Sequence, residues 1–265
     1  MLNTRGSHDC FSPDQGCPVS AAPLVVVTGG ARGIGRVLAE NWIANGARVA
    51  LADLDEDQAR ATAAELGSDV AFGVGCDVGD DASVQAAMEQ VAAWGGGIDC
   101  LVNNAGLHLM AWSRPPTEID SAGWMSILSV NVVGLVRCAR SARPWLTRSE
   151  NASIINISSV SGIVPRDVYG VSKLAVRGLT TALAAELAVD GIRVNCLAPG
   201  PMDTESAMAD LPSSLLEEFI ANKQLIQRQG RTGDLVGPAL FLASEASAFM
   251  TGETLVIGGG FPLRM

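Results

Sequence analysis

The chain has 265 residues, of which 48% are apolar and 5% aromatic, and its formal net charge is −10. This length allows one large α/β domain or two small ones, and the apolar composition is typical of a buried parallel sheet covered by alanine-rich helices. The negative charge argues against a nucleic-acid partner. Because the sequence has no polybasic patch and no run of roughly 20 apolar residues, we also expect no membrane partner.

The cysteine and histidine content limits the kind of site. Six cysteines are scattered without a Cys-x-x-Cys pair, mostly in apolar runs, so we expect a reduced, cytoplasmic protein. With only His8 and His108 present, a metal site or a Ser-His-Asp triad is poorly supported, and we expect no metal.

Residues 1–22 show no periodicity and lack the apolar core of a secretory signal. We expect a disordered extension there, with a partner-binding arm as the alternative. One domain is expected to follow over residues 23–265, because no linker divides the rest of the chain.

From Leu24 onward, short apolar runs alternate with amphipathic stretches. The apolar runs predict strands at Leu24–Val27, Arg48–Ala52, Val70–Val74, Ile98–Val102, Ile154–Ile157, Arg193–Leu197 and Thr254–Ile257. The amphipathic stretches predict helices at Ile34–Asn45, Glu56–Leu66, Ala82–Trp94, Ala122–Leu146, Val168–Val189 and Asp234–Ala243. Gly46 and Gly67 follow the first two helices, where a C-terminal cap favours glycine. The alternation predicts a single-domain, doubly wound parallel sheet of about seven strands with helices on both faces.

The segment Thr28–Gly35 joins the first strand to the first helix. Its glycines Gly29, Gly33 and Gly35 allow a tight turn, in which backbone N–H groups approach a pyrophosphate at the helix N-terminus. An ordinary flexible turn is the alternative. The position of the loop directly after a Leu-Val-Val-Val strand favours nucleotide binding.

Asp53 ends the second predicted strand, where an acidic side chain accepts hydrogen bonds from both adenosine ribose hydroxyls. Its charge would repel a 2′-phosphate, so it favours NAD over NADP. Arg32 in the glycine loop is the counter-signal, because a cation there would suit a 2′-phosphate. Asp53 has a helix cap as its alternative role, although Asp55 fits that role better.

Two further segments follow predicted strands, at the edge where open α/β sheets bind ligands. Asp77, followed by Val78, is placed to bond an adenine amino group, with capping of the next helix as an equal alternative. Asn104, Ala105 and Gly106 form a small-residue passage beside a flat cofactor, while the preceding Asn103 has the alternative of tying neighbouring strands together.

Tyr169 is the only tyrosine in the chain, and it stands four residues before Lys173 on a predicted helix. At this spacing the two side chains share one helix face. A lysine ammonium near a phenol favours the phenolate, so the pair suits general acid–base catalysis near neutral pH. Taken alone, the pattern also occurs by chance on solvated helix faces.

These motifs together resemble the short-chain dehydrogenase/reductase family. The glycine loop, Asn-Asn-Ala-Gly, Ser159, Tyr-x-x-x-Lys and Pro199-Gly200 occur in the family's order, and the match runs from about Leu24 to Gly260. The resemblance implies the family's shorter branch with a single Rossmann-type domain. It places the following residues at the cofactor: Thr28, Gly29, Arg32, Gly33, Ile34, Gly35, Asp53, Asp77, Val78, Asn104, Ala105, Gly106, Tyr169, Lys173, Pro199, Gly200, Met202 and Thr204.

The resemblance also implies roles in catalysis. Tyr169 would be the general acid/base, and Lys173 would lower its pKa and hold the ribose hydroxyls. Ser159 would hydrogen-bond the substrate oxygen, with Ser158 and Ser161 as alternatives. Asn131 would position a water that feeds the lysine.

Two features depart from the family pattern. The loop Val160–Val168 is shorter than in many members, which would open one wall of the substrate pocket and weakens the choice of Ser159 over Ser158. Gly258 stands where the family usually carries an aspartate.

The resemblance therefore implies an NAD-dependent oxidoreductase that interconverts a secondary alcohol and a ketone. An NADPH-dependent carbonyl or 3-oxoacyl reductase and a non-catalytic dinucleotide-binding scaffold are the alternatives. A homotetramer is expected first and a dimer next. The segment Asp203–Gln229 is predicted to be a helical lid over an apolar pocket, or otherwise a plain surface helix pair. The apolar residues assigned to the lid are Met202, Met208, Leu211, Leu215, Leu216 and Phe219. Residues that would line the site are His108, Leu109, Val160, Val164 and Arg166.

Overall fold

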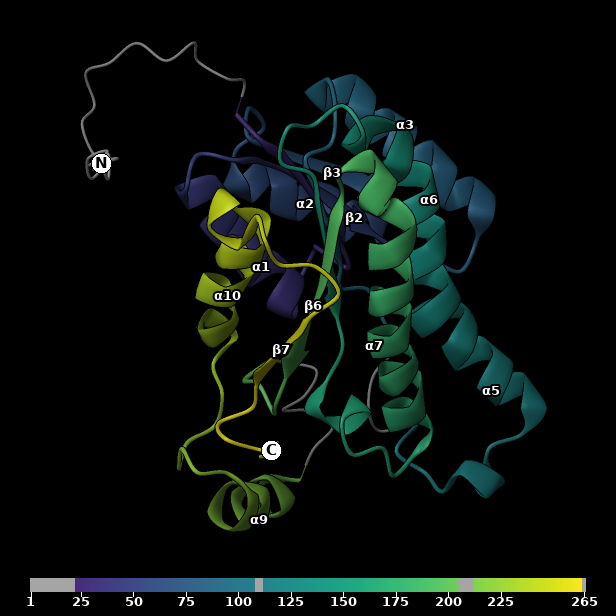
Figure 1. Ribbon diagram of the computed structural model, residues 1–265, viewed down its shortest axis with the longest axis vertical. Helices are drawn as coiled ribbons and strands as arrows, with labels where there is room; N and C mark the ends of the chain where they lie inside the picture. The colour runs from purple at the N-terminus through teal and green to yellow at the C-terminus, as the bar shows by residue number, and fades with distance from the viewer. Residues whose placement is uncertain (1–21, 108–111, 205–211, 264–265) are drawn as a thin grey trace, which may run out of the picture.

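The apolar runs pair into one parallel sheet in the computed structural model, which describes residues 22–107, 112–204 and 212–263 (Figure 1). Its strands are β1 (Leu24–Thr28), β2 (Arg48–Asp53), β3 (Ala71–Gly75), β4 (Cys100–Asn103), β5 (Ser153–Ile157), β6 (Arg193–Pro199) and β7 (Thr254–Ile257). They lie in the order β3-β2-β1-β4-β5-β6-β7. The chain moves outward from β1 to β3 and then places β4 on the other side of β1. Ligands of such sheets bind at the carboxyl ends of the strands where the order reverses.

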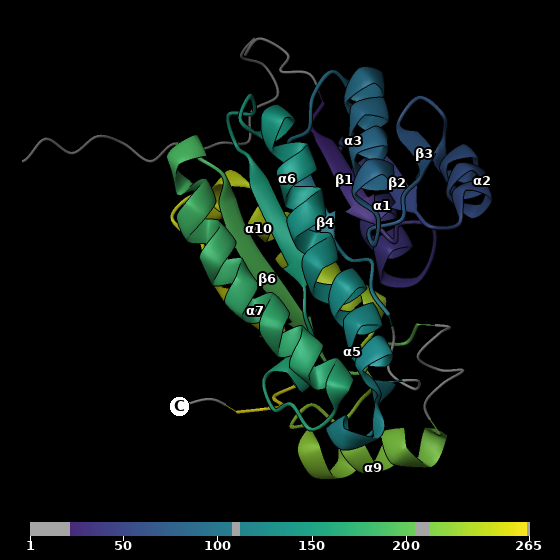
Figure 2. The same ribbon diagram turned by 90° about the vertical axis from the view of Figure 1, so that its right-hand side faces the viewer.

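Helices cover both faces of the sheet, because alternate strand residues point in opposite directions. Leu24 and Val26 of β1 pack into one apolar core, and Val25 and Val27 pack into the other. The first core contains residues of α3 (Asp81–Gly95), α6 (Gly134–Leu146) and α7 (Val168–Leu187), which lie next to one another (Figure 2). The second contains residues of α1 (Gly33–Ala44), α2 (Glu56–Leu66) and α10 (Val236–Ala243).

Aspartates start four of the described helices. Each side chain accepts a backbone N–H from the first turn and so satisfies one of its unpaired donors. The pairs are Asp55 with Gln58 in α2, Asp80 with Ser83 in α3, Asp120 with Gly123 in α5 (Ser121–Leu128), and Asp167 with Gly170 in α7. The expected cap role of Asp55 is therefore confirmed. Gly46 and Gly67 have the positive φ angles, +84° and +109°, that their expected place after a helix requires.

The helix predicted at Ala122–Leu146 contains an irregular turn. A π turn, η2 (Ser129–Val133), separates α5 from α6 and contains Asn131 at its centre. The predicted helix is confirmed in extent, as a continuous run over Ser121–Leu146, while the π turn within it was not predicted. A π turn inserts one extra residue into the helix, and such turns are frequent at functional sites.

The run Ser121–Leu146 is long and apolar enough, by length and composition, to cross a membrane, with a mean hydropathy of 1.4 over its most apolar window. From the sequence we expected no run of roughly 20 apolar residues. The run contains the polar residues Ser126, Ser129 and Asn131, which a mean over the window tolerates. The core helix of a soluble protein meets the same criterion. Here Arg137 forms an ion pair with Asp81 of α3, so the run is also attached to its neighbour. One such helix is weak evidence for a membrane.

The remaining described elements lie at the ends of the strands and in connections. They are α9 (Ser213–Lys223) and the 3₁₀ turns η1 (Pro116–Glu118), η3 (Val160–Gly162), η4 (Ala188–Asp190), η5 (Thr232–Leu235) and η6 (Glu245–Ser247). Both views place α9 at the end of the molecule where α7 begins (Figures 1 and 2). The segment predicted to be a lid therefore contains a helix. The predicted extension, residues 1–22, lies almost wholly outside the described residues.

Candidate active site

The glycine loop leaves the N-terminus of α1 open. Gly29 and Gly33 have φ angles of +62° and +55°, which favour glycine. A Cβ on Gly35 would lie 2.2 Å from the carbonyl oxygen of Gly29, so the loop closes tightly onto the helix. No side chain of the described residues caps α1, and its first turn carries no acidic residue. Its first backbone N–H groups are therefore suited to an anion.

Thr28 and Asn104 join this loop to the end of β4. The Thr28 hydroxyl accepts hydrogen bonds from the N–H groups of Asn104 and Ala105, both at 3.1 Å. The Asn104 amide donates to the carbonyl oxygens of Thr28 and Gly29, at 3.0 and 2.9 Å. The side chain of Asn103 instead donates to Asn156 of β5 at 2.8 Å, so its expected alternative, a tie between strands, is observed.

Asp53 lies beside the glycine loop and is buried. Its Oδ2 accepts a hydrogen bond from the N–H of Ala31 at 3.0 Å, and its Oδ1 accepts one from Asp55 at 3.2 Å. The helix cap is Asp55, so Asp53 is available for another role. Arg32 is exposed at the start of α1, while Ile34 packs against the second core.

Asp77 and Val78 follow β3 at the same edge. The Asp77 Oδ1 accepts a hydrogen bond from the N–H of Gly79 at 2.7 Å, which stabilises the turn. The cap of α3 is Asp80, so the expected alternative role of Asp77 as that cap was wrong. Val78 is buried, and Gly134 of α6 approaches it so closely that a Cβ there would lie 3.1 Å away.

Asn131 is fully buried and connects three parts of the site. Its Oδ1 accepts the N–H of Leu107 at 2.7 Å, and its Nδ2 donates to the Leu107 carbonyl and to the Ser172 hydroxyl, at 3.2 and 3.1 Å. Ser172 donates in turn to the carbonyl of Tyr169 at 2.7 Å. A Cβ on Gly106 would lie 3.2 Å from Asn131 Oδ1 and 3.5 Å from Lys173 Nζ, so only glycine leaves that space open.

The two adjacent serines at the end of β5 have different environments. The buried Ser158 donates its hydroxyl hydrogen bond to the backbone carbonyl of Lys173 at 2.7 Å. The half-buried Ser159 accepts from the N–H of Ser161 at 3.1 Å and hydrogen-bonds the side chain of Tyr169. Ser159 is therefore the serine whose hydroxyl faces the tyrosine.

Tyr169 and Lys173 are both buried on the first turns of α7. Burial is the main reason that the pKa of Tyr169 rises to about 12, while the hydrogen bond with Ser159 opposes this rise and the charge of Asp167 adds to it. Burial likewise lowers the pKa of Lys173 to about 8. The Lys173 ammonium donates to the carbonyl of Ile157 at 2.9 Å and lies 5.7 Å from the centre of the tyrosine ring.

The lowering of the tyrosine pKa by Lys173 was expected with the help of the positive nicotinamide. In the chain alone burial is the largest cause, and it raises the pKa of Tyr169. Lowering the tyrosine pKa therefore requires more positive charge near the phenol than the chain brings by itself.

The segment after β6 faces the glycine loop. A Cβ on Gly33 would lie 3.8 Å from the Thr204 side chain, which is buried. Met202 forms an isolated parallel β-bridge with Gly230, and the N–H of Gly200 donates to the carbonyl of Ile257 in β7 at 2.9 Å. Backbone hydrogen bonds therefore hold Pro199–Met202 in place. This places the expected nicotinamide segment opposite the N-terminus of α1.

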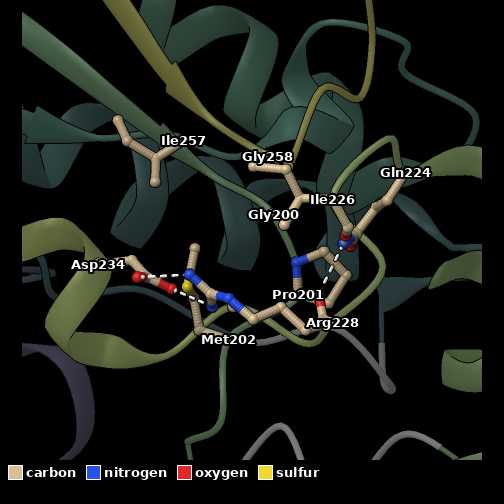
Figure 3. Close-up of a pocket in the computed structure, with 11 residues that line it drawn as sticks. Gly200, Pro201, Met202, Gln224, Ile226, Arg228, Asp234, Ile257 and Gly258 are labelled. Atoms are coloured by element: carbon tan, nitrogen blue, oxygen red, sulfur yellow. Dashed lines mark hydrogen bonds and ion pairs between the residues drawn. The ribbon is translucent and has the colours of Figure 1, made fainter.

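A cavity of about 260 Å³ lies behind this segment (Figure 3). It is lined by Gly200, Pro201, Met202, Gln224, Ile226, Arg228, Gly230, Asp234, Ile257, Gly258 and Gly259. Its charged residues, Arg228 and Asp234, are paired with each other at 2.7 Å. The catalytic candidates do not line it.

The expected substrate residues are only partly described. His108, Leu109, Met208 and Leu211 lie outside the described residues. Val160 is buried, and Val164 and Arg166 are exposed. The sequence analysis missed Trp112 and Trp124, which pack in one apolar cluster with Tyr169. The signal available for them was that two of the five tryptophans of an aromatic-poor sequence lie after the predicted fourth strand, one before the long predicted helix and one in its first turn.

Comparisons with known proteins agree with this geometry. The family model described as enoyl-(acyl carrier protein) reductase matches residues 29–262. L-fucose dehydrogenase of Oryctolagus cuniculus is 38% identical over 252 residues, covering 92% of this chain and 86% of that protein. Cis-4-hydroxycyclohexanecarboxylate dehydrogenase of Sinomonas cyclohexanicum is 35% identical over 247 residues, covering 91% and 97%.

A solved structure is similar over nearly the whole fold. The glucose/ribitol dehydrogenase of Brucella melitensis, titled a short-chain dehydrogenase/reductase, superposes with a TM-score of 0.84 and 31% identity, covering 91% of this chain and 97% of that chain. This chain belongs to the short-chain dehydrogenase/reductase family. It is therefore an oxidoreductase that acts on CH–OH groups with a nicotinamide dinucleotide cofactor, and its Rossmann-type fold is confirmed.

The residues of this short-chain dehydrogenase/reductase fit such a cofactor. The uncapped α1 suits the pyrophosphate, and the buried carboxylate of Asp53 suits ribose hydroxyls. Gly106 keeps space open between Asn131 and Lys173, where a Cβ would intrude. The open helix N-terminus, the acceptor carboxylate and the space at Gly106 thus fit a dinucleotide at three separate points.

Proposed function

We propose that this protein is a cytoplasmic, NAD-dependent dehydrogenase that interconverts a secondary alcohol and a ketone. The observation that carries the proposal is the meeting of Ser159, Tyr169 and Lys173 at the end of β5 and the start of α7. The four free cysteines among the described residues are all buried, which agrees with a reducing compartment.

Each side chain has a role that its environment permits. Tyr169 takes the proton of the alcohol or returns it to the ketone oxygen, and Ser159 donates a hydrogen bond to that oxygen as charge develops on it. Lys173 stabilises the phenolate and binds the cofactor ribose. Asn131 keeps Leu107 and Ser172 in place beside them. When bound, the nicotinamide supplies the acceptor or donor of the hydride.

Asp53 supports NAD over NADP. A buried carboxylate beside the glycine loop favours ribose hydroxyls and repels a 2′-phosphate. The exposed Arg32 supports the alternative, NADP, because its guanidinium forms no ion pair within the described residues.

The substrate class follows from the aromatic cluster and from the relatives. Trp112 and Trp124 pack beside Tyr169 and give the site apolar faces for a ring. One relative is named for a hydroxylated cyclohexane that carries a carboxylate, and another for a sugar. Arg166, exposed in the loop between Ser159 and Tyr169, forms no ion pair with any described residue. A cyclic alcohol with an anionic or polar substituent is therefore the first candidate substrate.

A homotetramer is the proposed assembly, with a dimer as the alternative. Helix α7 packs beside α5 and the π turn (Figure 2). Each of these elements exposes an apolar side chain: Met125, Val133 and Leu174 are 66%, 43% and 43% exposed. Apolar side chains that face solvent on neighbouring helices agree with burial between subunits.

The first experiment tests the cofactor. The protein is titrated with NADH and with NADPH, followed by quenching of tryptophan fluorescence. Tight NADH binding and weak NADPH binding are expected. Asp53→Ala should weaken NADH binding far more than NADPH binding, whereas the control Asp55→Ala, which removes only the cap of α2, should leave their ratio unchanged. Equal losses for both nucleotides in Asp53→Ala would remove the argument for NAD.

The second experiment tests the reaction. Cyclic alcohols with and without a carboxylate are supplied with NAD, and an enoyl thioester and a 3-oxoacyl thioester are supplied with NADH and, separately, with NADPH. Oxidation of a cyclic alcohol that Tyr169→Phe abolishes, while NADH still binds, is the expected result. Turnover of a thioester alone would favour the reductase, and nucleotide binding without any turnover would favour the scaffold.

A further inference from the structure

The chain turns back on itself directly after β7. The N–H of Phe261 donates to the carbonyl of Gly258 at 3.0 Å, and Gly259 and Gly260 have φ angles of +62° and +89°. We call residues 258–261 the terminal turn. Positive φ angles at two successive positions make glycine strongly favoured at both.

The terminal turn packs against the residue that follows Ser159. A Cβ on Gly258 would lie 2.8 Å from Cγ1 of Val160 and 2.2 Å from the carbonyl oxygen of Phe261. The aspartate usual in the family would therefore not fit here without moving the turn. Glycine at this position lets the turn lie directly on the loop that carries the candidate serine.

The other side of the terminal turn holds the chain that follows α9. The carbonyl of Gly259 accepts hydrogen bonds from the N–H groups of Leu225 and Ile226, at 2.8 and 2.9 Å. Gln224, which is buried, donates to the carbonyls of Ile226 and Arg228, at 3.0 and 2.9 Å (Figure 3). The polar groups at the end of α9 are thus satisfied by the turn and by each other.

Helix α9 has few other attachments. It packs extensively against no other described helix or strand, and Leu216 is its one buried residue. Its clearest aromatic contact is with the terminal turn, where the rings of Phe219 and Phe261 meet edge to face with centres 4.9 Å apart. An element with so little buried surface depends on such contacts for its position.

We infer that Phe261 is a specificity-determining residue, which sets the position of α9 over the substrate end of the site through Phe219. The inference rests on the proposed function, because it assigns α9 to the substrate rather than to the cofactor. The terminal turn contacts both α9 and Val160, which is next to Ser159. A substrate that displaces α9 therefore also pushes on Val160, beside the place of the substrate oxygen. The preferred size of the alcohol is therefore set partly by the carboxyl-terminal end of the chain.

Steady-state kinetics of Phe261→Ala test this inference. The KM for the alcohol is expected to rise about tenfold, equivalent to about 1.4 kcal/mol, which is near the upper range for an aromatic pair. The KM for NAD should change less than about twofold, since the cofactor loop is untouched. Phe219→Ala should have the same effect, and the double variant should be no worse than either single one, because both remove one contact. Phe249→Ala is the control, since Phe249 is fully exposed.

Hydrogen exchange gives a readout that needs no substrate. In Phe261→Ala, amides of α9 should exchange faster while amides of α7 keep their protection, and Phe249→Ala should change neither. Unchanged α9 exchange, or an unchanged KM for the alcohol, would overturn the inference. If the wild type oxidises no alcohol but α9 is released in Phe261→Ala, the proposed function fails while the attachment of α9 by Phe261 stands.

Discussion

Ser158 and Ser159 are adjacent and chemically identical, yet their surroundings differ. The Ser158 hydroxyl donates its hydrogen bond to the backbone of α7, whereas Ser159 faces Tyr169. Ser159→Ala is expected to lower kcat by about 10²–10³-fold, as when a donor to a developing oxyanion is lost. Ser158→Ala should instead reduce stability by about 1 kcal/mol and change kcat only slightly, because it removes one buried hydrogen bond to the backbone of α7. Kinetics and urea unfolding of both variants check the assignment, and reversed effects would exchange the two roles.

Lys173 makes the stability of the cofactor-free protein depend on pH. Its folded pKa of about 8 lies below the ordinary 10.5. Its contribution is therefore fully present above the ordinary pKa and is lost as the pH falls through about 8. Lys173→Met removes this dependence. At pH 7 the variant should have a larger free energy of unfolding than the wild type, because it buries no charge. This difference should shrink by roughly 2 kcal/mol between about pH 7 and pH 9.5.

Urea unfolding at the two pH values measures this difference. The buried cysteines, whose pKa values burial also raises, are common to both proteins and cancel. A gap that stays constant with pH would show that Lys173 is not desolvated in the folded chain.

Individual residues were predictable where a local rule applies. The cap by Asp55 and the strand tie by Asn103 follow from residue type and position alone. The choice between Ser158 and Ser159 and the raised pKa of Tyr169 were not predictable, because both depend on which groups the folded chain buries beside them.

At the scale of elements, the π turn holds the site together. Asn131, at the centre of the turn, joins the loop after β4 to α7 through the hydrogen bonds of its side-chain amide. Asn131→Leu should destabilise the protein by roughly 2–3 kcal/mol, because the N–H of Leu107 and the hydroxyl of Ser172 lose a buried partner. It should also lower kcat.

Ser172→Ala separates the two effects of this substitution. It removes one bond of Asn131 and keeps the bond to Leu107, so it should cost about 1 kcal/mol of stability and retain most activity. Thermal unfolding and kcat are measured for both variants. An Asn131→Leu protein with wild-type kcat would limit the π turn to a structural role.

Strands and capped helices were predictable from apolar runs and from aspartates before them. The π turn and the attachment of α9 were not. The residues of the π turn, Ser129–Val133, carry no local signal that distinguishes them from an α-helix, and α9 is held by Phe261, far away in sequence. Contacts of long sequence separation leave no local pattern.

The whole molecule carries one prediction about assembly. A wild-type chain of 27.4 kDa should sediment as a homotetramer or dimer. Val133→Glu combined with Leu174→Glu should shift it toward the monomer, because each places a charge on an exposed apolar position of the proposed interface. Leu54→Glu is the control, since Leu54 is 75% exposed at the end of β2 and away from α5 and α7. Sedimentation velocity measures all three, and dissociation by Leu54→Glu instead would place the interface elsewhere.

The parallel sheet with helices on both faces follows from the alternation of strands and helices, so the architecture was largely predictable, whereas the strand order is seen only in the folded chain. The path of residues 258–261 back to Val160 was not, because it depends on Gly258 in place of an aspartate and on space that only the folded chain defines.

The burial of the only tyrosine has a practical consequence. Any ultraviolet absorbance of tyrosinate, and any resonance of a fluorinated tyrosine incorporated throughout the chain, originates from Tyr169 alone. The ionisation of the candidate catalytic phenol can therefore be followed without overlap from any other tyrosine. Adding nucleotide during such a titration would show how far the charge of the bound nucleotide shifts the pKa of the phenol from its pKa in the free chain.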